Sequence, residues 1–239
     1  GQRDVLAIRG LGQFQKFKAA NELRQPIENW HVSDFHVSMA RGVKEAVGDA
    51  DHLSVTGDNL QQVAKNLHDS YPEVFQSILR KMRERVPGVC DIETEDTLDG
   101  RLLLKFRNDT FEDPFIDKFV SDGTIKMFAY LVLLHDPQPH PFLCVEEPEN
   151  QLYPKLLPAL AEEFREYALR GGQVFVSTHS PDFLNAIEVD EVFWLEKNEA
   201  GFTDIRRASD DPQIVDYMKD GDQMGYLWKQ GLFGKVDPR

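Results

Sequence analysis

The second half of the sequence alternates strand-length apolar runs with helical stretches, and this alternation restricts the possible folds more than any other feature. Apolar runs stand at residues 142–146 and 173–177, and residues 154–170 between them repeat apolar positions at helical spacing. A short helix is expected from residue 181, followed by a further apolar run at 191–196. Strands separated by helices pair in parallel, so the sequence predicts an α/β fold with a parallel sheet flanked by helices.

The helix expected at residues 154–170 has one apolar face. Pro154 suits its first turn, and the Gly171-Gly172 pair ends it. The inward face is predicted to consist of Leu156, Leu157, Leu160, Phe164 and Tyr167. The charged residues between them, Glu163 included, are predicted to face water.

The first half of the chain has a different pattern. Apolar positions at residues 60–67 and 75–86 recur every three or four residues, which predicts two helices in a hairpin. At residues 94–109, the turn dipeptide Asp99-Gly100 precedes alternating apolar residues and predicts a β-hairpin. Residues 1–58 hold only short apolar stretches, which predict no particular arrangement.

The change of pattern near residue 141 predicts two parts, a mixed strand and helical lobe at 1–140 and an α/β core at 141–239. The apolar, aromatic tail at residues 223–233 is expected to pack into the core of the second part. A docking surface for a second subunit or an effector protein is the alternative for this tail.

Charge and cysteine usage exclude several classes of protein. Lys and Arg number 27 against 41 Asp and Glu, and the net charge of −14 argues against a broadly basic nucleic-acid-binding surface. Cys90 and Cys144 form no CxxC pair, so we expect both to be small core residues of a protein in a reducing cytoplasm.

No apolar run approaches the roughly 20 residues that cross a bilayer, and no membrane partner is expected. The first residues carry no export signal and indicate the middle of a longer protein.

Carboxylates follow the apolar run at residues 142–146. Glu146 ends this run, and Glu147, Pro148 and Glu149 come next. Ligands of open α/β sheets bind at the carboxyl ends of the strands, and the proline makes the chain leave the strand there. Two adjacent carboxylates can then divide the work of holding Mg²⁺ and of orienting or deprotonating an attacking water. A solvated acidic loop is the simpler alternative.

A histidine follows the next apolar run. Ser180 is a good N-cap and Pro181 a good first helical residue, so His179 is expected at the end of the strand at 173–177. In a parallel sheet this end lies on the same edge as Glu146 and Glu147. A histidine there can hydrogen-bond a transferring phosphate or its water, and a purely structural role is the alternative.

A third polar cluster precedes the strongly apolar stretch at residues 125–134. Ser121 or Asp122 can cap the helix expected there, and Gly123 lets a ligand approach the backbone closely. The cluster is therefore a candidate anion site at a helix N-terminus. Helix capping alone also explains these residue types.

Taken in their order along the chain, the three clusters resemble the C-terminal half of an ABC-type ATPase head of the SMC, RecF and OLD-like kind. The likeness is greatest to small bacterial AAA-family ATPases. Residues 121–124 resemble the signature motif, 143–147 Walker B, 149–152 the D-loop and 177–181 the H-loop. The resemblance implies a P-loop NTPase-like sheet with a helical signature lobe, and its specific part covers residues 119–185.

The resemblance also implies roles for single residues, with ATP and Mg²⁺ as substrate and cofactor. Glu147 is implied to be the catalytic base of ATP hydrolysis, and Glu146 the acid associated with Mg²⁺. His179 is implied to contact the γ-phosphate. The family usually has aspartate where this sequence has Glu146, a side chain longer by one methylene.

The signature residues are implied to act across a dimer. Ser121 and Gly123 would bind the γ-phosphate of ATP held by a second copy, and Asn150 of the D-loop would belong to the nucleotide-binding residues. Family heads work as head-to-tail dimers with two ATP molecules between them. The signature reads Val-Ser-Asp-Gly-Thr where the family has Leu-Ser-Gly-Gly-Gln, which puts Asp122 near the expected triphosphate.

The phosphate-binding Walker A motif, GxxxxGK[ST], does not occur in this sequence. We expect the Walker A lobe to lie upstream of this sequence or on another chain, or to have been lost.

The favoured function is therefore the C-terminal part of an ATP-hydrolysing head, which would be inactive as this chain alone. DNA repair or defence is the suggested setting. A degenerate head that binds DNA or an effector protein is the alternative. A third hypothesis is a Mg²⁺-dependent nuclease that uses Glu146, Glu147 and Glu149 as a carboxylate cluster.

Overall fold

The computed structural model describes residues 18–41, 51–98, 102–109, 113–116 and 119–234. The chain forms two compact units, residues 1–148 with 163–177, and residues 149–162 with 178–239. These bounds differ from the two parts expected at 1–140 and 141–239, which stay a prediction. None of the described helices has the length and apolar character needed to span a membrane.

A parallel sheet forms the centre of the first unit. Its strands are β1 (Trp30–Ser33), β5 (Phe142–Glu146) and β6 (Gln173–Ser177), in the order β1-β5-β6. Both strand pairs are parallel, so the predicted α/β class is confirmed. On β5, Leu143 and Val145 are buried and their neighbours are more exposed, so one face of the sheet is covered much more than the other.

The described helices of this unit are α2 (Lys18–Glu28), α3 (Val37–Ala40), α4 (Leu60–Ser70), α5 (Pro72–Arg85), α6 (Asp122–Leu134) and the end of α7 (Leu157–Leu169). Of these, α3, α4 and α5 pack against α6. All residues of α6 from Thr124 onward are buried, because α4 and α5 pack on one side of it and its Tyr130 contacts Phe164 of α7. A helix that is apolar all round is stable only in such a core.

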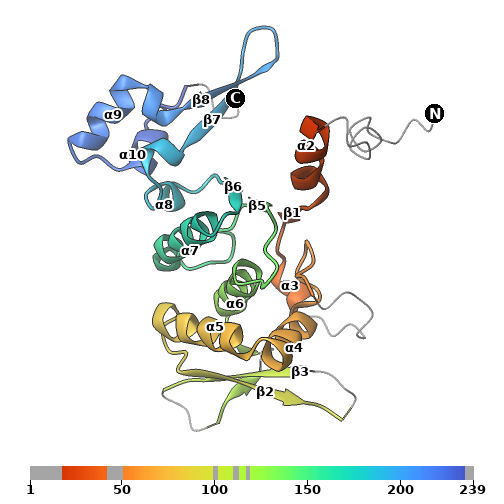
Figure 1. Ribbon diagram of the computed structural model, residues 1–239. Coiled ribbons are helices and arrows are strands. Elements are labelled where there is room, and N and C mark those ends of the chain that lie inside the picture. The colour runs from red at the N-terminus through yellow and green to blue at the C-terminus, as the bar shows by residue number, and fades with distance from the viewer. Residues whose placement is uncertain (1–17, 42–50, 99–101, 110–112, 117–118, 235–239) are drawn as a thin grey trace. The chain divides into compact units, whose positions relative to one another are not determined.

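A second, antiparallel sheet covers the outer side of α4 and α5 (Figure 1). Its strands are β2 (Asp91–Asp96), β3 (Leu102–Arg107) and β4 (Phe115–Ile116). The predicted helical hairpin and β-hairpin are both confirmed, although the turn at Asp99-Gly100 lies outside the described residues. Phe106 of β3 reaches α6, where its ring meets Phe128 edge-on.

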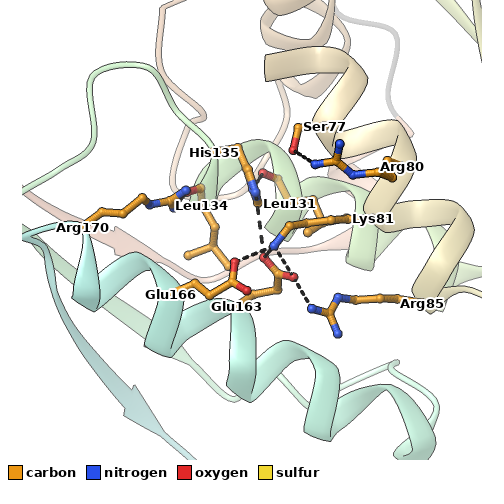
Figure 2. Close-up of polar contacts among 10 residues, drawn as sticks. All are labelled: Ser77, Arg80, Lys81, Arg85, Leu131, Leu134, His135, Glu163, Glu166 and Arg170. Atoms are coloured by element: carbon orange, nitrogen blue, oxygen red, sulfur yellow. Dashed lines mark hydrogen bonds and ion pairs between the residues drawn. The ribbon is translucent and has the colours of Figure 1, made fainter. Parts of the chain in front are cut away.

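The prediction that Glu163 faces water is wrong, because its side chain is only 1% exposed. Lys81 and Arg85 of α5 each place a nitrogen 2.8 Å from its carboxylate, and His135 lies at 3.9 Å. Lys81 also bonds Glu166, one turn further along α7, at 2.6 Å (Figure 2). The two cations of α5 compensate a carboxylate that would otherwise not tolerate burial.

The second unit holds one two-stranded sheet and short helices. Its elements are η2 (Pro154–Leu156), the start of α7, α8 (Pro181–Leu184), η3 (Val189–Glu191), β7 (Phe193–Lys197), β8 (Thr203–Arg207), η4 (Ala208–Asp210), α9 (Pro212–Lys219) and α10 (Met224–Lys229). The apolar run at 191–196 was expected to extend the parallel sheet, and that expectation is wrong. β7 pairs antiparallel with β8. The Asn198 side chain accepts bonds from the backbone N–H groups of Ala200 and Phe202, which turns the chain back on itself.

The core of the second unit packs against the buried face of β7, which carries Trp194. The ring of Trp194 meets that of Phe233 edge-on at a centroid distance of 5.4 Å. The other buried members of this core are Val192, Ala208, Ile214, Met224 and Leu227. The expected core packing of the tail is therefore confirmed for Met224, Leu227 and Phe233, whereas Tyr226 is 54% exposed. The two cysteines are free and half-buried, and so less buried than expected.

Candidate functional site

The carboxyl ends of β5 and β6 lie next to each other. Glu146 is in register with Ser177, and the N–H of Glu147 donates to the Ser177 carbonyl at 2.9 Å. The shared edge predicted for these two strand ends is thus confirmed. The hydroxyl of Ser177 and the carboxylate of Glu146 provide hard oxygen donors at this edge, the ligand type that Mg²⁺ prefers.

The two acidic residues differ in their environment. Glu146 is exposed on the open face of β5, where burial, and then the charge of Glu146, raise the pKa of the neighbouring Cys144 thiol. Glu147 is half-buried and has a φ of 38°, in the left-handed region. For a residue with a Cβ this conformation costs about 1–2 kcal/mol. Strain of this kind concentrates at functional sites. Here it turns the backbone at the end of β5, so the Glu147 side chain departs from the direction that it would have in a continued strand.

A hydrogen-bonded turn in the second unit holds the backbone of the predicted H-loop. Oε1 of Glu149 accepts bonds from the Thr178 hydroxyl at 2.6 Å and from the N–H of His179 at 3.1 Å. The Thr178 hydroxyl oxygen in turn accepts from the N–H of Ser180 at 3.0 Å. Glu149 therefore positions the exposed His179. This role was missed from the sequence, because no local spacing connects the two loops.

The N-terminal turn of α8 forms as expected. The Ser180 hydroxyl accepts from the N–H of Phe183 at 3.2 Å, and Pro181 is the first helical residue. Asn150, the predicted D-loop residue, is exposed in the turn before η2. Both His179 and Asn150 belong to the second unit, whereas Glu146 and Glu147 belong to the first.

The predicted signature residues stand at the start of α6. Ser121 is the N-cap, and its hydroxyl accepts from the N–H of Thr124 at 3.2 Å, so the predicted capping is confirmed. Asp122 is exposed and accepts a bond from Arg41 at 2.7 Å, while Arg41 also donates to the carbonyl of Val120. Arg41 thus pairs with the carboxylate at the second position of the predicted signature. Sequence reasoning missed it, because Arg41 lies far from Asp122 along the chain.

Residues 15–185 match the family model described as "AAA domain, putative AbiEii toxin, Type IV TA system". The chain belongs to this AAA domain family. The matched range includes all seven predicted site residues, from Ser121 to His179. The recognition of the chain as an AAA-family ATPase domain, of the nucleotide-binding kind, is confirmed. No curated protein matches the chain.

Several solved SMC heads have a distant likeness to this chain. One, from work on ATP-driven dimerization and DNA-stimulated activation of SMC ATPases, is 13% identical with a TM-score of 0.47 and covers 66% of this chain and 99% of its own. An SMC head bound to the C-terminal winged helix domain of ScpA is 18% identical with a TM-score of 0.43 over 62% of this chain. The Pyrococcus yayanosii Smc head is 13% identical with a TM-score of 0.47 over 68% of this chain. The chain covers 47% and 31% of the latter two structures.

Proposed function

We propose that this chain is the part of an ATP-hydrolysing head that runs from the signature motif to the H-loop. The observation that carries the proposal is the Glu146-Glu147 pair at the carboxyl end of the central parallel strand of an AAA-family domain. That edge is where α/β sheets bind their ligands. The reaction would convert ATP and water to ADP and phosphate.

In this mechanism, the side chains position the reactants and stabilise charge. Glu147 would orient the attacking water and accept its proton, while Glu146 and the Ser177 hydroxyl would hold Mg²⁺. When bound, Mg²⁺ neutralises negative charge on the phosphate oxygens. His179 donates a hydrogen bond to the γ-phosphate, and Glu149 keeps the backbone of His179 in place. Positioning and electrostatics of this type account for most of the catalysis of phosphoryl transfer.

The open face of the parallel sheet is proposed to bind the Walker A lobe. Trp30 and Phe175 are 55% and 50% exposed there, and the ring of Phe142 lies between theirs at 6.2 and 4.8 Å. Parallel sheets are normally covered on both faces, and an aromatic stripe of this kind marks an interaction surface. The lobe would supply the GxxxxGK[ST] loop that this sequence does not contain.

A second copy of the head is the proposed partner for hydrolysis. Ser121, Gly123 and the Arg41–Asp122 pair would face the γ-phosphate bound by that copy, with Asn150 at the same interface. The setting is proposed to be cytoplasmic. Because the family description names a toxin of a toxin–antitoxin system, we propose defence as the output, with DNA or an effector protein as the target.

The test is ATP turnover by the head reconstituted with its Walker A lobe. Glu147→Gln is expected to abolish turnover and to retain ATP-dependent dimerisation, because the amide keeps the shape of the side chain and cannot accept the proton. Glu199→Gln, an exposed acid in the turn between β7 and β8, is the matched control and should leave turnover unchanged. Full turnover by Glu147→Gln would refute the proposal.

A degenerate, non-hydrolysing head is the second candidate, and the carboxylate of Asp122 within the signature favours it. A charged group there repels a triphosphate unless Arg41 compensates it. ATP turnover by the unmutated reconstituted head separates the two candidates, because the degenerate head releases no phosphate. The nuclease hypothesis has less support, since Glu149 already uses one carboxylate oxygen to hold the backbone of His179.

A further inference from the structure

Three histidines and an aspartate gather in the first unit, away from the residues proposed to hydrolyse ATP. His31 lies on β1, His52 precedes α4, and Asp136 and His140 lie on the connection from α6 to β5. One ligand atom from each of His52, Asp136 and His140 lies within 4.8 Å of the other two. Separate segments of the chain therefore converge on one small, half-buried volume.

His52 and Asp136 are held in place by further hydrogen bonds. Nδ1 of His52 lies 2.7 Å from Oδ2 of Asp136, whose side chain is only 6% exposed. The other carboxylate oxygen of Asp136 accepts from the N–H of Gln138 at 2.8 Å. The carbonyl of His52 accepts from the Asn59 amide at 2.8 Å. Such outer bonds orient the ligands in metal sites.

The ring of His140 presents a nitrogen lone pair. Its Nε2 is buried and has no hydrogen-bond partner among the described residues. The ring bonds the backbone of Asn29, so Nδ1 carries the proton and Nε2 is the available acceptor. The carbonyl of His140 accepts from the Tyr167 hydroxyl at 2.6 Å, which fixes this part of the chain.

His31 stacks on His140, with ring centroids 4.6 Å apart and planes 14° from parallel. Burial lowers the pKa of His140, and burial with the neighbouring histidines lowers the pKa of His31 to about 4. Leaving a buried acceptor unsatisfied costs about 1–3 kcal/mol, a cost that a bound cation would remove at His140.

We propose that His52, Asp136 and His140 form a binding site for Zn²⁺, with water as the fourth ligand. Two nitrogens and one carboxylate oxygen suit zinc, whereas Mg²⁺ prefers an all-oxygen set. Ligand atoms around tetrahedral zinc lie about 3.3 Å apart. The ligand atoms of the three residues lie within 4.8 Å of one another, so small side-chain rotations bring them to this spacing. The ion replaces the hydrogen bond between His52 and Asp136, and the proton of that bond moves to the second ring nitrogen of His52 or is released to solvent.

Such a site would fasten two parts of the unit together. It joins the segment before α4 to the connection that leads from α6 into β5, the strand that ends at Glu146. The zinc site thereby supports both the signature helix and the acidic edge of the sheet. It does not depend on ATP hydrolysis and is testable without nucleotide.

The test uses the full chain, purified without a histidine tag, stripped with EDTA and dialysed free of nucleotide. Titration with Zn²⁺ against a chromophoric chelator is expected to give one bound ion per chain, and excess Mg²⁺ should not compete. Titration with Co²⁺ should give the intense visible absorption of a four-coordinate ion. This spectrum reports on the ligand geometry of the unmutated chain, so it does not depend on the folding of any variant.

Two substitutions and one control then locate the site. His52→Ala and Asp136→Asn are each expected to weaken zinc binding by about tenfold or more. His68→Ala is the matched control, because His68 forms an exposed pair with Asp69 at 2.8 Å, outside the cluster, and should leave binding unchanged. Absence of saturable zinc binding would overturn the proposal. So would binding that survives both substitutions, or a Co²⁺ spectrum of the six-coordinate aqueous type.

Discussion

Removing the charge of Glu163 with Glu163→Gln is expected to destabilise the first unit by about 3 kcal/mol. Removing one partner of a buried ion pair costs about 3–5 kcal/mol, because the remaining charge stays buried without compensation. Glu163 is 1% exposed, and Lys81 and Arg85 are 13% and 18% exposed. Lys81 keeps Glu166 as a partner at 2.6 Å, so the lower end of the range applies.

Urea unfolding followed by circular dichroism measures this change. The midpoint should fall while the slope with urea stays the same, because the surface exposed on unfolding is unchanged. In a thermal scan, about 3 kcal/mol corresponds to a loss of about 6–12 °C for a chain of this size. Glu166→Gln is the matched control, since Glu166 is 43% exposed and its loss should cost less than about 1 kcal/mol.

Two results would refute this reasoning. One is a cost for Glu163→Gln below about 1 kcal/mol, which would mean that water reaches the cations and screens them. The other is an equal cost for both substitutions, which would mean that burial of Glu163 has no energetic role.

Three further predictions test other features. Ser121→Ala should cost about 1 kcal/mol in urea unfolding, because it removes the N-cap bond to Thr124, and Ser121→Gly should cost less. Gly225→Ala should cost about 1–3 kcal/mol, since its Cβ would lie 2.1 Å from the backbone carbonyl oxygen of Pro181, and equal stability would mean that α8 and α10 can separate. The hydrogen bond from Lys81 lowers the pKa of Glu166, so this pair stabilises the fold at neutral pH and its contribution is lost as the pH falls through the lowered pKa. Glu166→Gln should therefore flatten the acid end of a stability profile, and an unchanged profile would count against the pair.

Local patterns in the sequence predicted most of the local structure. The helical hairpin, the caps of α6 and α8, and the strands β5 and β6 all follow from spacing and from residue types at helix ends. The edge with Glu146 could be predicted because the carboxyl ends of parallel strands lie at the same edge of a sheet. Each of these predictions needs only residues that are close in the sequence.

Features that depend on distant partners could not be predicted. β1 joins β5 across more than a hundred residues, and its short sequence, Trp30 to Ser33, has no pattern that selects a parallel partner. The burial of Glu163 depends on cations from α5. The strand β7 looks the same in sequence whether it pairs in parallel or with β8, and only the turn at Asn198 decides between the two.

The exposed indole on β1 provides an intrinsic optical reporter. Of the three tryptophans in the chain, Trp194 is 8% exposed and Trp228 is half-buried, whereas Trp30 is 55% exposed on the open face of the parallel sheet. Any polypeptide that covers this face moves that one indole from water into an apolar environment. Its emission should then shift to shorter wavelength, so assembly of the complete head can be followed by fluorescence without a label.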